Sequence, residues 1–419
     1  MSTGVIVIKR FWILLCLVGS AAHAQEPVAQ SWTLKQLLVQ VRQSNRDVLT
    51  AQRLHQAAQA DQRTASVTPS PVLSINTQQI DPGHLGHGSL WARPVDTVVR
   101  VDQPLERGGK AHWRTEVAQL AEQASAQDLS EAIREQVVQA SQAYWDLKLA
   151  QEQWRISVDN ETLAKSSSGL ARLRLAQGDL SRLDATRLEV EAQRAANERE
   201  SAAQQVKAAQ ATLARLVGRE GVALTADDAW PTAPTAKSMH LPSLSDRADV
   251  LAATRRVEQA RAALSLAESQ RSADVTVGLQ FEHDPPSGAR WWGVGVSIPL
   301  GVDGRQDGPV QRARIDLATA EAELERIQAQ AQAERSVQLQ ALETAARRVE
   351  RIEQHLLPQA REAAQSADYA RKQGALSLQD VLDARRTLHA AELDAEAAHA
   401  DLARALAALG LLKEQESEK

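Results

Sequence analysis

Long stretches without glycine or proline dominate this sequence. They are rich in Ala, Gln, Glu, Arg and Leu, and they span residues 32–68, 110–168, 179–217, 247–277, 310–357 and 375–409. Such runs of helix-forming residues predict α-helices, with the fourth run turning to a strand pattern near its end. A helix from Lys110 to about Gln177 would extend roughly 100 Å at about 1.5 Å per residue. That length exceeds an ordinary globular helix and predicts a coiled-coil-like assembly.

Apolar positions in two of these runs recur at alternating steps of three and four. The first series has one polar exception, Gln151, and consists of Val137, Ala140, Tyr144, Leu147, Gln151, Trp154 and Val158. The second series consists of Leu342, Ala345, Val349, Ile352 and Leu356. This spacing is typical of the seam between helices that pack knobs into holes. We therefore expect Trp145 and Trp154 to pack in the helical core.

Four short stretches alternate strictly between apolar and polar residues. They are residues 73–77, 97–102, 275–279 and 292–298, and a loop rich in Gly and Pro separates the two members of each pair. A period of two is the pattern of a half-buried strand, so the sequence predicts two antiparallel hairpins.

The two halves of the chain carry the same motifs in the same order. Residues 103–110 align with 298–305 at an offset of 195, and residues 177–181, with Asp184, align with 373–377, with Asp380, at an offset of 196. Two matched motifs at nearly one offset indicate an internal duplication. Each half reads as helix, hairpin, long helix, glycine-centred turn and helix.

This pattern divides the chain into five segments. Residues 25–218 form the predicted first repeat and 246–412 the second, joined by a proline-containing linker at 219–245. Residues 413–419 form a polar tail. Residues 1–24 have the features of a signal peptide, with Lys9 and Arg10 before a short apolar run and an Ala-x-Ala site ending at Ala24. We therefore expect export and cleavage after Ala24.

Composition narrows the classes of function. The hydrophobic fraction is 43%, but only 3% of residues are aromatic, and much of the rest is alanine, which suits closely packed helices. The net charge of −5 and the lack of a basic stripe argue against nucleic-acid binding. Cys16 is the only cysteine and lies in the leader, so the mature chain has no disulfide.

No catalytic or cofactor motif is present. The sequence lacks a nucleotide-binding loop, a nucleophile elbow and a metal-spaced His/Glu helix, so we expect no enzyme activity and no cofactor. His84 and His87 share one predicted hairpin loop and His283 lies near the other, but no carboxylate stands at ligand spacing from His84. Solvated loop histidines are therefore favoured over a metal site.

Four strands per chain are too few for a membrane barrel. Strands survive in lipid only in a closed barrel, and the smallest such barrels have about eight strands. Several chains would have to share one barrel. The alternative is a pair of soluble hairpins that cap a helical rod.

The motifs resemble those of the TolC-like outer-membrane efflux protein family over essentially the whole mature chain. They are the leader, the Trp32-Thr33-Leu34 helix start, the Pro-Leu-x-x-x-Gly-Lys/Arg strand exits, the Gly-x-Leu-Ser-x-x-Asp turns and the stretch 374–384. The resemblance implies a mainly α fold with a small β part. A homotrimer would share a 12-stranded barrel in the outer membrane that continues into a periplasmic helical barrel.

The same resemblance implies function and partners. The duct would receive small solutes or metal cations from a periplasmic adaptor and an inner-membrane pump, of the resistance-nodulation-division type, and conduct them passively to the exterior. The modest length and short loops resemble the cobalt–zinc–cadmium branch. Alternatives are a duct for type I protein secretion and a periplasmic helical adaptor or scaffold; an adaptor would show a single central helical hairpin.

Family resemblance also points to gate residues at the periplasmic turns, which centre on Gly178 and Gly374. Asp380 and Asp383 match the aspartates that form rings at the entrance, and Asp184 matches a gate-region aspartate in the first half. Carboxylate rings at a constriction favour cations. The alternative is that an aspartate beside a glycine turn is part of a helix cap.

The sequence departs from the family pattern at two positions near the second turn. Arg371 and Leu376 occupy the positions of a tyrosine and an arginine in the gate-locking network of the best-known member, so different pairs would hold a closed state here. Trp91 and the Trp291-Trp292 pair flank the predicted strands, where membrane-interface aromatic residues are expected, with loop packing as the alternative.

Overall fold

The structure is a computed structural model that describes residues 30–78, 80, 95–234, 241–284, 287–300 and 306–411. Several predictions lie outside these residues. They concern the signal peptide at 1–24, His84, His87, Trp91 and the polar tail at 413–419.

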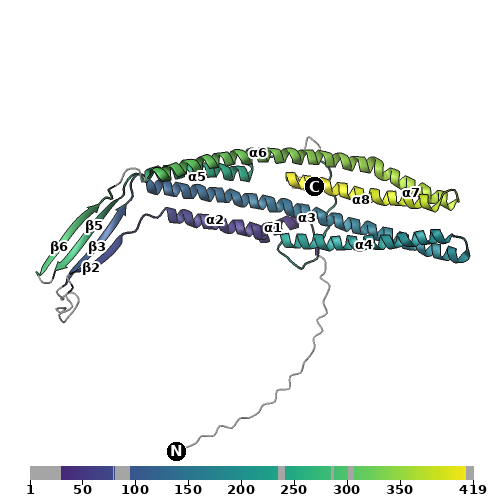
Figure 1. Cartoon of the computed structure of the whole chain (residues 1–419), viewed down its shortest axis with the longest axis horizontal. Helices are drawn as coiled ribbons and strands as arrows, with labels where there is room; N and C mark the ends of the chain where they lie inside the picture. Colours follow the sequence, from purple (N-terminus) through teal and green to yellow (C-terminus); the bar gives the residue numbers. More distant parts are fainter. Residues whose placement is uncertain are drawn as a thin grey trace, which may run out of the picture.

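The described chain forms a long helical rod with a β-sheet at one end and two helical turns at the other (Figure 1). The helices are α1 (Leu34–Ser44), α2 (Arg46–Ala65), α3 (Lys110–Gln177), α4 (Arg182–Leu216), α5 (Ala248–Ser269), α6 (Asp307–Arg351), α7 (Leu357–Lys372) and α8 (Leu378–Leu409). A 3-10 turn, η2 (Leu244–Asp246), precedes α5, and a π-helical segment, η3 (Ile352–Leu356), joins α6 to α7. The predicted long helix is confirmed, because α3 runs for 68 residues without a break.

The strands form two separate sheets. β1 (Gln30–Trp32) and β4 (Leu224–Ala226) make a short parallel pair beside the rod. β2 (Val72–Gln78), β3 (Asp96–Leu105), β5 (Val275–Asp284) and β6 (Ala289–Ser297) make an antiparallel sheet in the order β2-β3-β5-β6. The two predicted hairpins are confirmed, and the pairing of β3 with β5 joins them into one sheet. β2 and β6 are its edges.

The register gives this sheet one apolar and one polar face, because side chains alternate between faces along each strand. The apolar face carries Leu73, Ile75, Val99, Val101, Val277, Leu279, Phe281, Trp292, Val294 and Val296. The polar face carries Ser74, Asn76, Arg100, Asp102, Gln280 and Glu282, together with Val98 and Trp291. The adjacent tryptophans 291 and 292 therefore point to opposite faces, and Trp292 packs against Phe281 at a ring distance of 5.1 Å.

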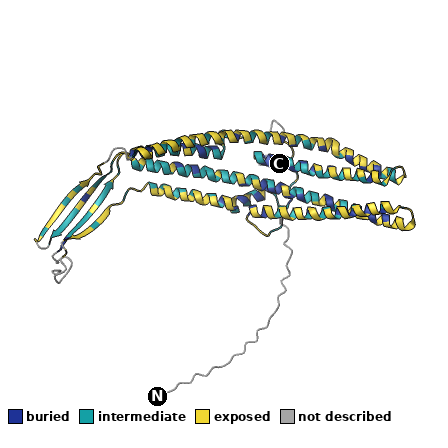
Figure 2. Ribbon diagram, in the orientation of Figure 1, coloured by how far each residue is buried: buried dark blue, intermediate teal, exposed yellow. Residues whose placement is uncertain are grey.

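The rod is built by helices that pack lengthwise on α3 and on each other. α3 lies along α2, α4, α5 and α8, while α6 packs against α5 and α8, and α7 packs against α8. Buried residues lie where these helices face one another, and much of the outer surface is exposed (Figure 2). Among the described residues, no helix combines the length and apolarity needed to cross a lipid bilayer.

The largest buried cluster lies around α1, midway along the rod. Leu37 and Val41 of α1 pack with Tyr144 and Leu147 of α3 and with Leu213 of α4. Each of these side chains is nearly or fully removed from solvent. Burial of apolar side chains at about 25 cal/mol per Å² makes this cluster a main source of stability.

The predicted helix over residues 32–68 is broken at Asn45. Asn45 is the N-cap of α2, and its side-chain oxygen accepts hydrogen bonds from the backbone N–H groups of Asp47 and Val48. Its amide donates to Gln136 of α3 and to the carbonyl of Leu216. Asn45 is only 3% exposed, so these tertiary hydrogen bonds, and not local helix propensity, place the break.

Part of the predicted linker at 219–245 packs against the rod. Trp230 stacks on Trp145 at 5.5 Å and on His399 of α8 at 6.0 Å, and its indole N–H donates to Glu396. The backbone N–H of Ala226 in β4 donates to Gln151, which explains the polar exception in the α3 seam. The division of the chain at 219–245 remains a prediction.

One residue in each of the two predicted seams is not buried as expected. Trp145 is buried as expected, but Trp154 is 43% exposed, because the buried face drifts to Ile156 and Ser157 along a helix with 3.6 residues per turn. Leu356 is 40% exposed because η3 inserts a π turn before Pro358. Proline cannot donate the helical hydrogen bond and clashes with the preceding turn, which favours such an insertion.

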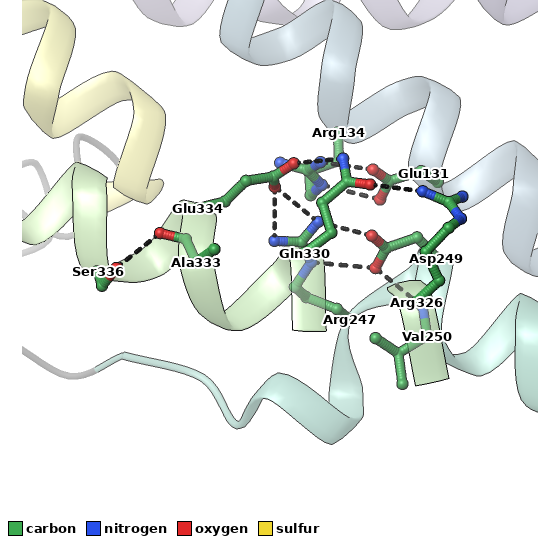
Figure 3. Close-up of polar contacts among 10 residues, drawn as sticks. All are labelled: Glu131, Arg134, Arg247, Asp249, Val250, Arg326, Gln330, Ala333, Glu334 and Ser336. Carbon is green, nitrogen blue, oxygen red and sulfur yellow. Dashed lines mark hydrogen bonds and ion pairs between the residues drawn. The ribbon is translucent and has the colours of Figure 1, made fainter. Parts of the chain in front are cut away.

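A charged network fixes the start of α5 (Figure 3). Arg247 donates to Asp249 at 2.6 and 3.0 Å and to Glu334 of α6 at 3.0 Å. Burial opposes ionisation of Asp249, but the hydrogen bonds and charge of Arg247, together with the N–H of Val250 and the charge of Arg134, outweigh it and lower the pKa of this carboxyl. The hydrogen bond with Asp249 raises the pKa of the Arg247 guanidinium. The network therefore links the start of α5 to α6.

Candidate functional site at the two helical turns

The two predicted glycine turns lie together at the end of the rod opposite the sheet (Figure 1). Gly178 ends α3 and Gly374 follows α7, with φ angles of +81° and +75°. The N–H of Asp179 donates to the carbonyl of Arg174, and the N–H of Ala375 donates to that of Ala370. Glycine is suited to this left-handed C-terminal cap because it has no Cβ. Both predicted turn positions thus reverse the chain in the same way.

A serine begins the helix after each turn. Ser181 accepts a hydrogen bond from the N–H of Asp184 at 3.1 Å, and Ser377 accepts one from the N–H of Asp380 at 3.2 Å. The Ser377 hydroxyl also donates to the carboxylate of Asp380 at 2.5 Å. The structure therefore places Asp184 and Asp380 in the first turns of α4 and α8, where a negative charge stabilises the helix N-terminus.

Asp383 lies one turn further along α8. Its side chain is 59% exposed and accepts a hydrogen bond from Arg386 at 3.2 Å. Asp383 takes no part in the serine cap. Asp380 and Asp383 are both exposed, whereas Asp184 is half-buried, with its side chain 29% exposed.

Apolar side chains join the two turns. Ala171 of α3 packs with Ala185 and Leu188 of α4, and Leu378 and Leu382 of α8 pack against this cluster. The small alanines let the helices approach closely, so the first-repeat turn and the second-repeat turn form one tip. A groove between α4 and α8 remains open beside this cluster and is lined by Leu183, Val190 and Leu382, with Arg194 and Arg386.

Charged side chains of α8 reach across to the first repeat. The guanidinium of Arg386 donates to both carboxylate oxygens of Glu191 on α4, at 2.6 and 3.1 Å. The hydrogen bond from Arg386 lowers the pKa of Glu191, and the same bond raises the pKa of Arg386. This bidentate geometry is the strongest form of an arginine–carboxylate contact.

Two neighbours extend this bridge. Arg385 donates to Asp368 of α7 at 2.9 and 3.1 Å and to Ser167 of α3 at 3.3 Å. The Nε2 atom of His389 lies 2.8 Å from a carboxylate oxygen of Glu198 on α4. We call Arg385, Arg386 and His389, with these partners, the α8 clasp. It ties the α7–α8 hairpin to the α3–α4 hairpin at the tip.

Sequence reasoning did not identify the α8 clasp. No repeat pattern marks the pair of Glu191 and Arg386, because the two residues are 195 apart whereas the adjoining turns repeat at an offset of 196. Arg371 stands at a position where the best-known family member has a residue of its gate-locking network. Here its guanidinium donates a hydrogen bond to the carbonyl of Leu376 within the same turn.

The described residues contain no group of three or more His, Cys, Asp or Glu side chains arranged to hold a metal ion. The chemistry that the described residues present at the tip is electrostatic. It consists of capped helix ends, an exposed carboxylate and ion pairs that connect two helical hairpins.

Comparison with known proteins gives the context of this architecture. Residues 37–219 match the family described as outer membrane efflux protein. Over 308 residues the chain is 25% identical to the cobalt-zinc-cadmium resistance protein CzcC of Cupriavidus metallidurans, covering 71% of this chain and 72% of CzcC.

Solved structures share the fold. A membrane protein from Pseudomonas aeruginosa superposes with a TM-score of 0.76 at 22% identity, covering 90% of this chain and 92% of that one. The Campylobacter jejuni CmeC outer membrane channel superposes with a TM-score of 0.75 at 15% identity, covering 99% and 96%. The helical rod and terminal sheet of this chain are therefore similar to those of outer membrane efflux proteins, whose family model matches residues 37–219.

Proposed function

We propose that three copies of this chain form the outer-membrane exit duct of a tripartite efflux system, which conducts solutes passively and catalyses no reaction. The observation that carries the proposal is the four-stranded sheet, which has an apolar face, a polar face and two unpaired edges at β2 and β6. Open edges are unstable in lipid, and pairing β2 of one chain with β6 of the next removes them. Three chains would give a closed barrel of twelve strands with the apolar face toward lipid.

The helical rod supports the second half of the proposal. α3 alone runs for 68 residues, which is roughly 100 Å at about 1.5 Å per residue. Side by side, three rods would make a periplasmic tunnel that continues the barrel. Exposed apolar side chains on the outside of the helices, such as Leu170, Leu173 and Val337, would be covered in that assembly.

The tip would then be the periplasmic entrance. We assign Asp383 to a ring of three carboxylates there, and we place Asp380 and Asp184 beside it as charged helix caps. The turns at Gly178 and Gly374 would face a periplasmic adaptor protein and, through it, an inner-membrane pump of the resistance-nodulation-division type. The α8 clasp would hold the two hairpins of each chain together in place of the lock that Arg371 and Leu376 cannot form.

Metal cations are the proposed cargo. Similarity to CzcC, whose name refers to cobalt, zinc and cadmium resistance, supports this class. The exposed carboxylate of Asp383 favours cations over anions at a narrow entrance.

Two measurements test the duct. Native mass spectrometry of detergent-extracted protein from fractionated envelopes should give a trimer from the outer membrane. Deletion of the gene should increase sensitivity to zinc, cobalt or cadmium, and wild-type protein should restore resistance. A monomer in the soluble periplasmic fraction would refute the shared barrel and favour a scaffold, whereas a trimer without any metal phenotype would refute only the cargo.

A further inference from the structure

An ion pair lies in the middle of the polar face of the sheet. The Nε atom of Arg100 donates to both carboxylate oxygens of Asp102, at 2.8 and 2.9 Å. The two residues stand two positions apart on β3, so their side chains share a face. Their side chains are 33% and 22% exposed, which shows that the pair lies against the sheet and does not extend from it.

Glycines on the neighbouring strands make room for this pair. Gly278 of β5 stands opposite Asp102, and Gly295 of β6 stands opposite Gly278. A Cβ atom on Gly278 would lie 2.8 Å from Nη2 of Arg100 and closer still to the Asp102 carboxylate, and one on Gly295 would lie 3.4 Å from Nη2. The guanidinium therefore occupies the space that two missing side chains leave above the backbone.

The charge of the polar face is otherwise acidic. Alternation from Asp102 and Gln280 places Asp96, Glu282 and Asp284 on the same face. Among the described residues of β2, β3, β5 and β6, Arg100 is the one arginine or lysine on this face, because Arg290 alternates onto the other. The pairing of Arg100 with Asp102 therefore decides whether this face presents a free positive charge.

We infer that Arg100, clamped by Asp102 over Gly278 and Gly295, sets the charge selectivity and the free width of the β-lined section of the channel. The inference rests on the proposed function, since the polar face lines a pore only in the closed barrel. A paired guanidinium contributes little field, so Glu282 and Asp284 dominate and small cations are favoured. Because it lies flat, the side chain also leaves the bore open.

Charge-neutralising variants separate the two partners. Asp102→Asn frees Arg100, and the cation-to-anion permeability ratio should fall by roughly twofold or more. Arg100→Gln leaves Asp102 unpaired and should raise the ratio. Arg100→Gln/Asp102→Asn should return it close to the wild-type value, because the pair is removed as a unit. Arg290→Gln, which removes one positive charge from the opposite face of the sheet, is the matched control and should leave the ratio unchanged.

A steric variant tests the recess. Gly278→Val keeps every charge but fills the space beneath Arg100, so the guanidinium must move away from the sheet and single-channel conductance should fall. Gly288→Val is the control, because no atom lies within 4 Å of a Cβ built there, although its φ of +68° adds local strain at that turn.

The measurement is the reversal potential and conductance of purified protein in planar lipid bilayers under a potassium chloride gradient, after native mass spectrometry of each variant. Conducting trimers whose permeability ratio and conductance are the same for wild type, Asp102→Asn and Gly278→Val would overturn this inference alone. Wild-type protein that forms neither trimers nor channels would overturn the proposed function and the inference together.

Discussion

At the scale of single residues, the Tyr144 hydroxyl takes part in four hydrogen bonds within the central core. It accepts hydrogen bonds from the N–H groups of Asp227 and Asp228, at 3.2 and 3.1 Å, and lies 2.8 Å from the Asp228 carboxylate. Burial raises the pKa of this hydroxyl, so it stays protonated at physiological pH. One phenol thus attaches the segment after β4 to α3.

Tyr144→Phe should lower the free energy of unfolding by about 2 kcal/mol, because it leaves buried N–H groups without an acceptor while the ring volume is kept. Tyr369→Phe is the matched control, since Tyr369 is 67% exposed and should change the free energy by less than about 0.5 kcal/mol. Denaturant unfolding of both variants measures the difference. Equal stability of the two would contradict the role of the buried hydroxyl.

The α8 clasp gives a second prediction at this scale. Arg386→Ala should cost only about 0.5 to 1 kcal/mol in stability, because the guanidinium is half exposed and solvent screens the pair. The α7–α8 hairpin should nevertheless separate more readily from α4, and single-channel conductance should rise. Reversing the pair with Glu191→Arg/Arg386→Glu should restore wild-type conductance.

The control for the clasp is Arg326→Ala, which removes an ion pair with Glu323 inside α6 and connects no hairpins. Conductance unchanged in Arg386→Ala, or changed equally in Arg326→Ala, would show that the clasp does not hold the tip.

At the scale of elements, the start of α5 depends on charge. The pKa of Asp249 is lowered in the folded protein, so its ionised form stabilises the fold above the unfolded value of about 4, and this contribution is lost as pH falls through the folded pKa. We expect Asp249→Asn to cost about 1 kcal/mol at pH 7, a value discounted for partial exposure.

The difference in unfolding free energy between wild type and Asp249→Asn should narrow as pH falls below about 4. Urea unfolding at several pH values between about 3 and 7 measures it. Asp316→Asn, which breaks an exposed pair with Arg312 within one helix, should show a small difference throughout. A difference for Asp249→Asn that does not change with pH would exclude its charge as the cause.

The boundaries of the helices and strands show which structural features the local sequence can predict. The 68 residues of α3 and the four alternating strands were predicted because helix propensity and periodicity act within a few residues. The break between α1 and α2 at Asn45 was not predicted. The Asn45 amide is held by hydrogen bonds to Gln136 and to the carbonyl of Leu216, and both partners are far away in the chain. The parallel β1–β4 pair was missed for the same reason, since three residues carry no readable period.

At the scale of the whole molecule, the entrance should select cations if three chains converge at their tips. Asp383→Asn should shift the reversal potential in planar bilayers toward anions, because it removes an exposed carboxylate at each tip. Asp184→Asn is the comparison, as that carboxylate lies in the first turn of α4 and is less exposed. An unchanged reversal potential in Asp383→Asn would remove the entrance ring from the proposed mechanism.

At the candidate site, too, the local features were predictable from the sequence and the long-range contacts were not. Both glycine turns and their serine caps were predictable, because a positive φ and a first-turn hydrogen bond are local requirements met by Gly178, Gly374, Ser181 and Ser377. The α8 clasp was not, because nothing near Arg386 indicates that its partner is Glu191 on α4.

The sequence by itself determined the length of the helices, the alternation of the strands, the turns and the duplicated order of these elements, since each depends on neighbours within one or two turns of the chain. Only the tertiary structure decided that β3 pairs with β5 to make one sheet, that Trp154 is exposed, and that Arg100 lies over Gly278 and Gly295. The physical reason is that these outcomes depend on which distant backbones and side chains meet, and packing geometry chooses among many partners that local propensity leaves equivalent.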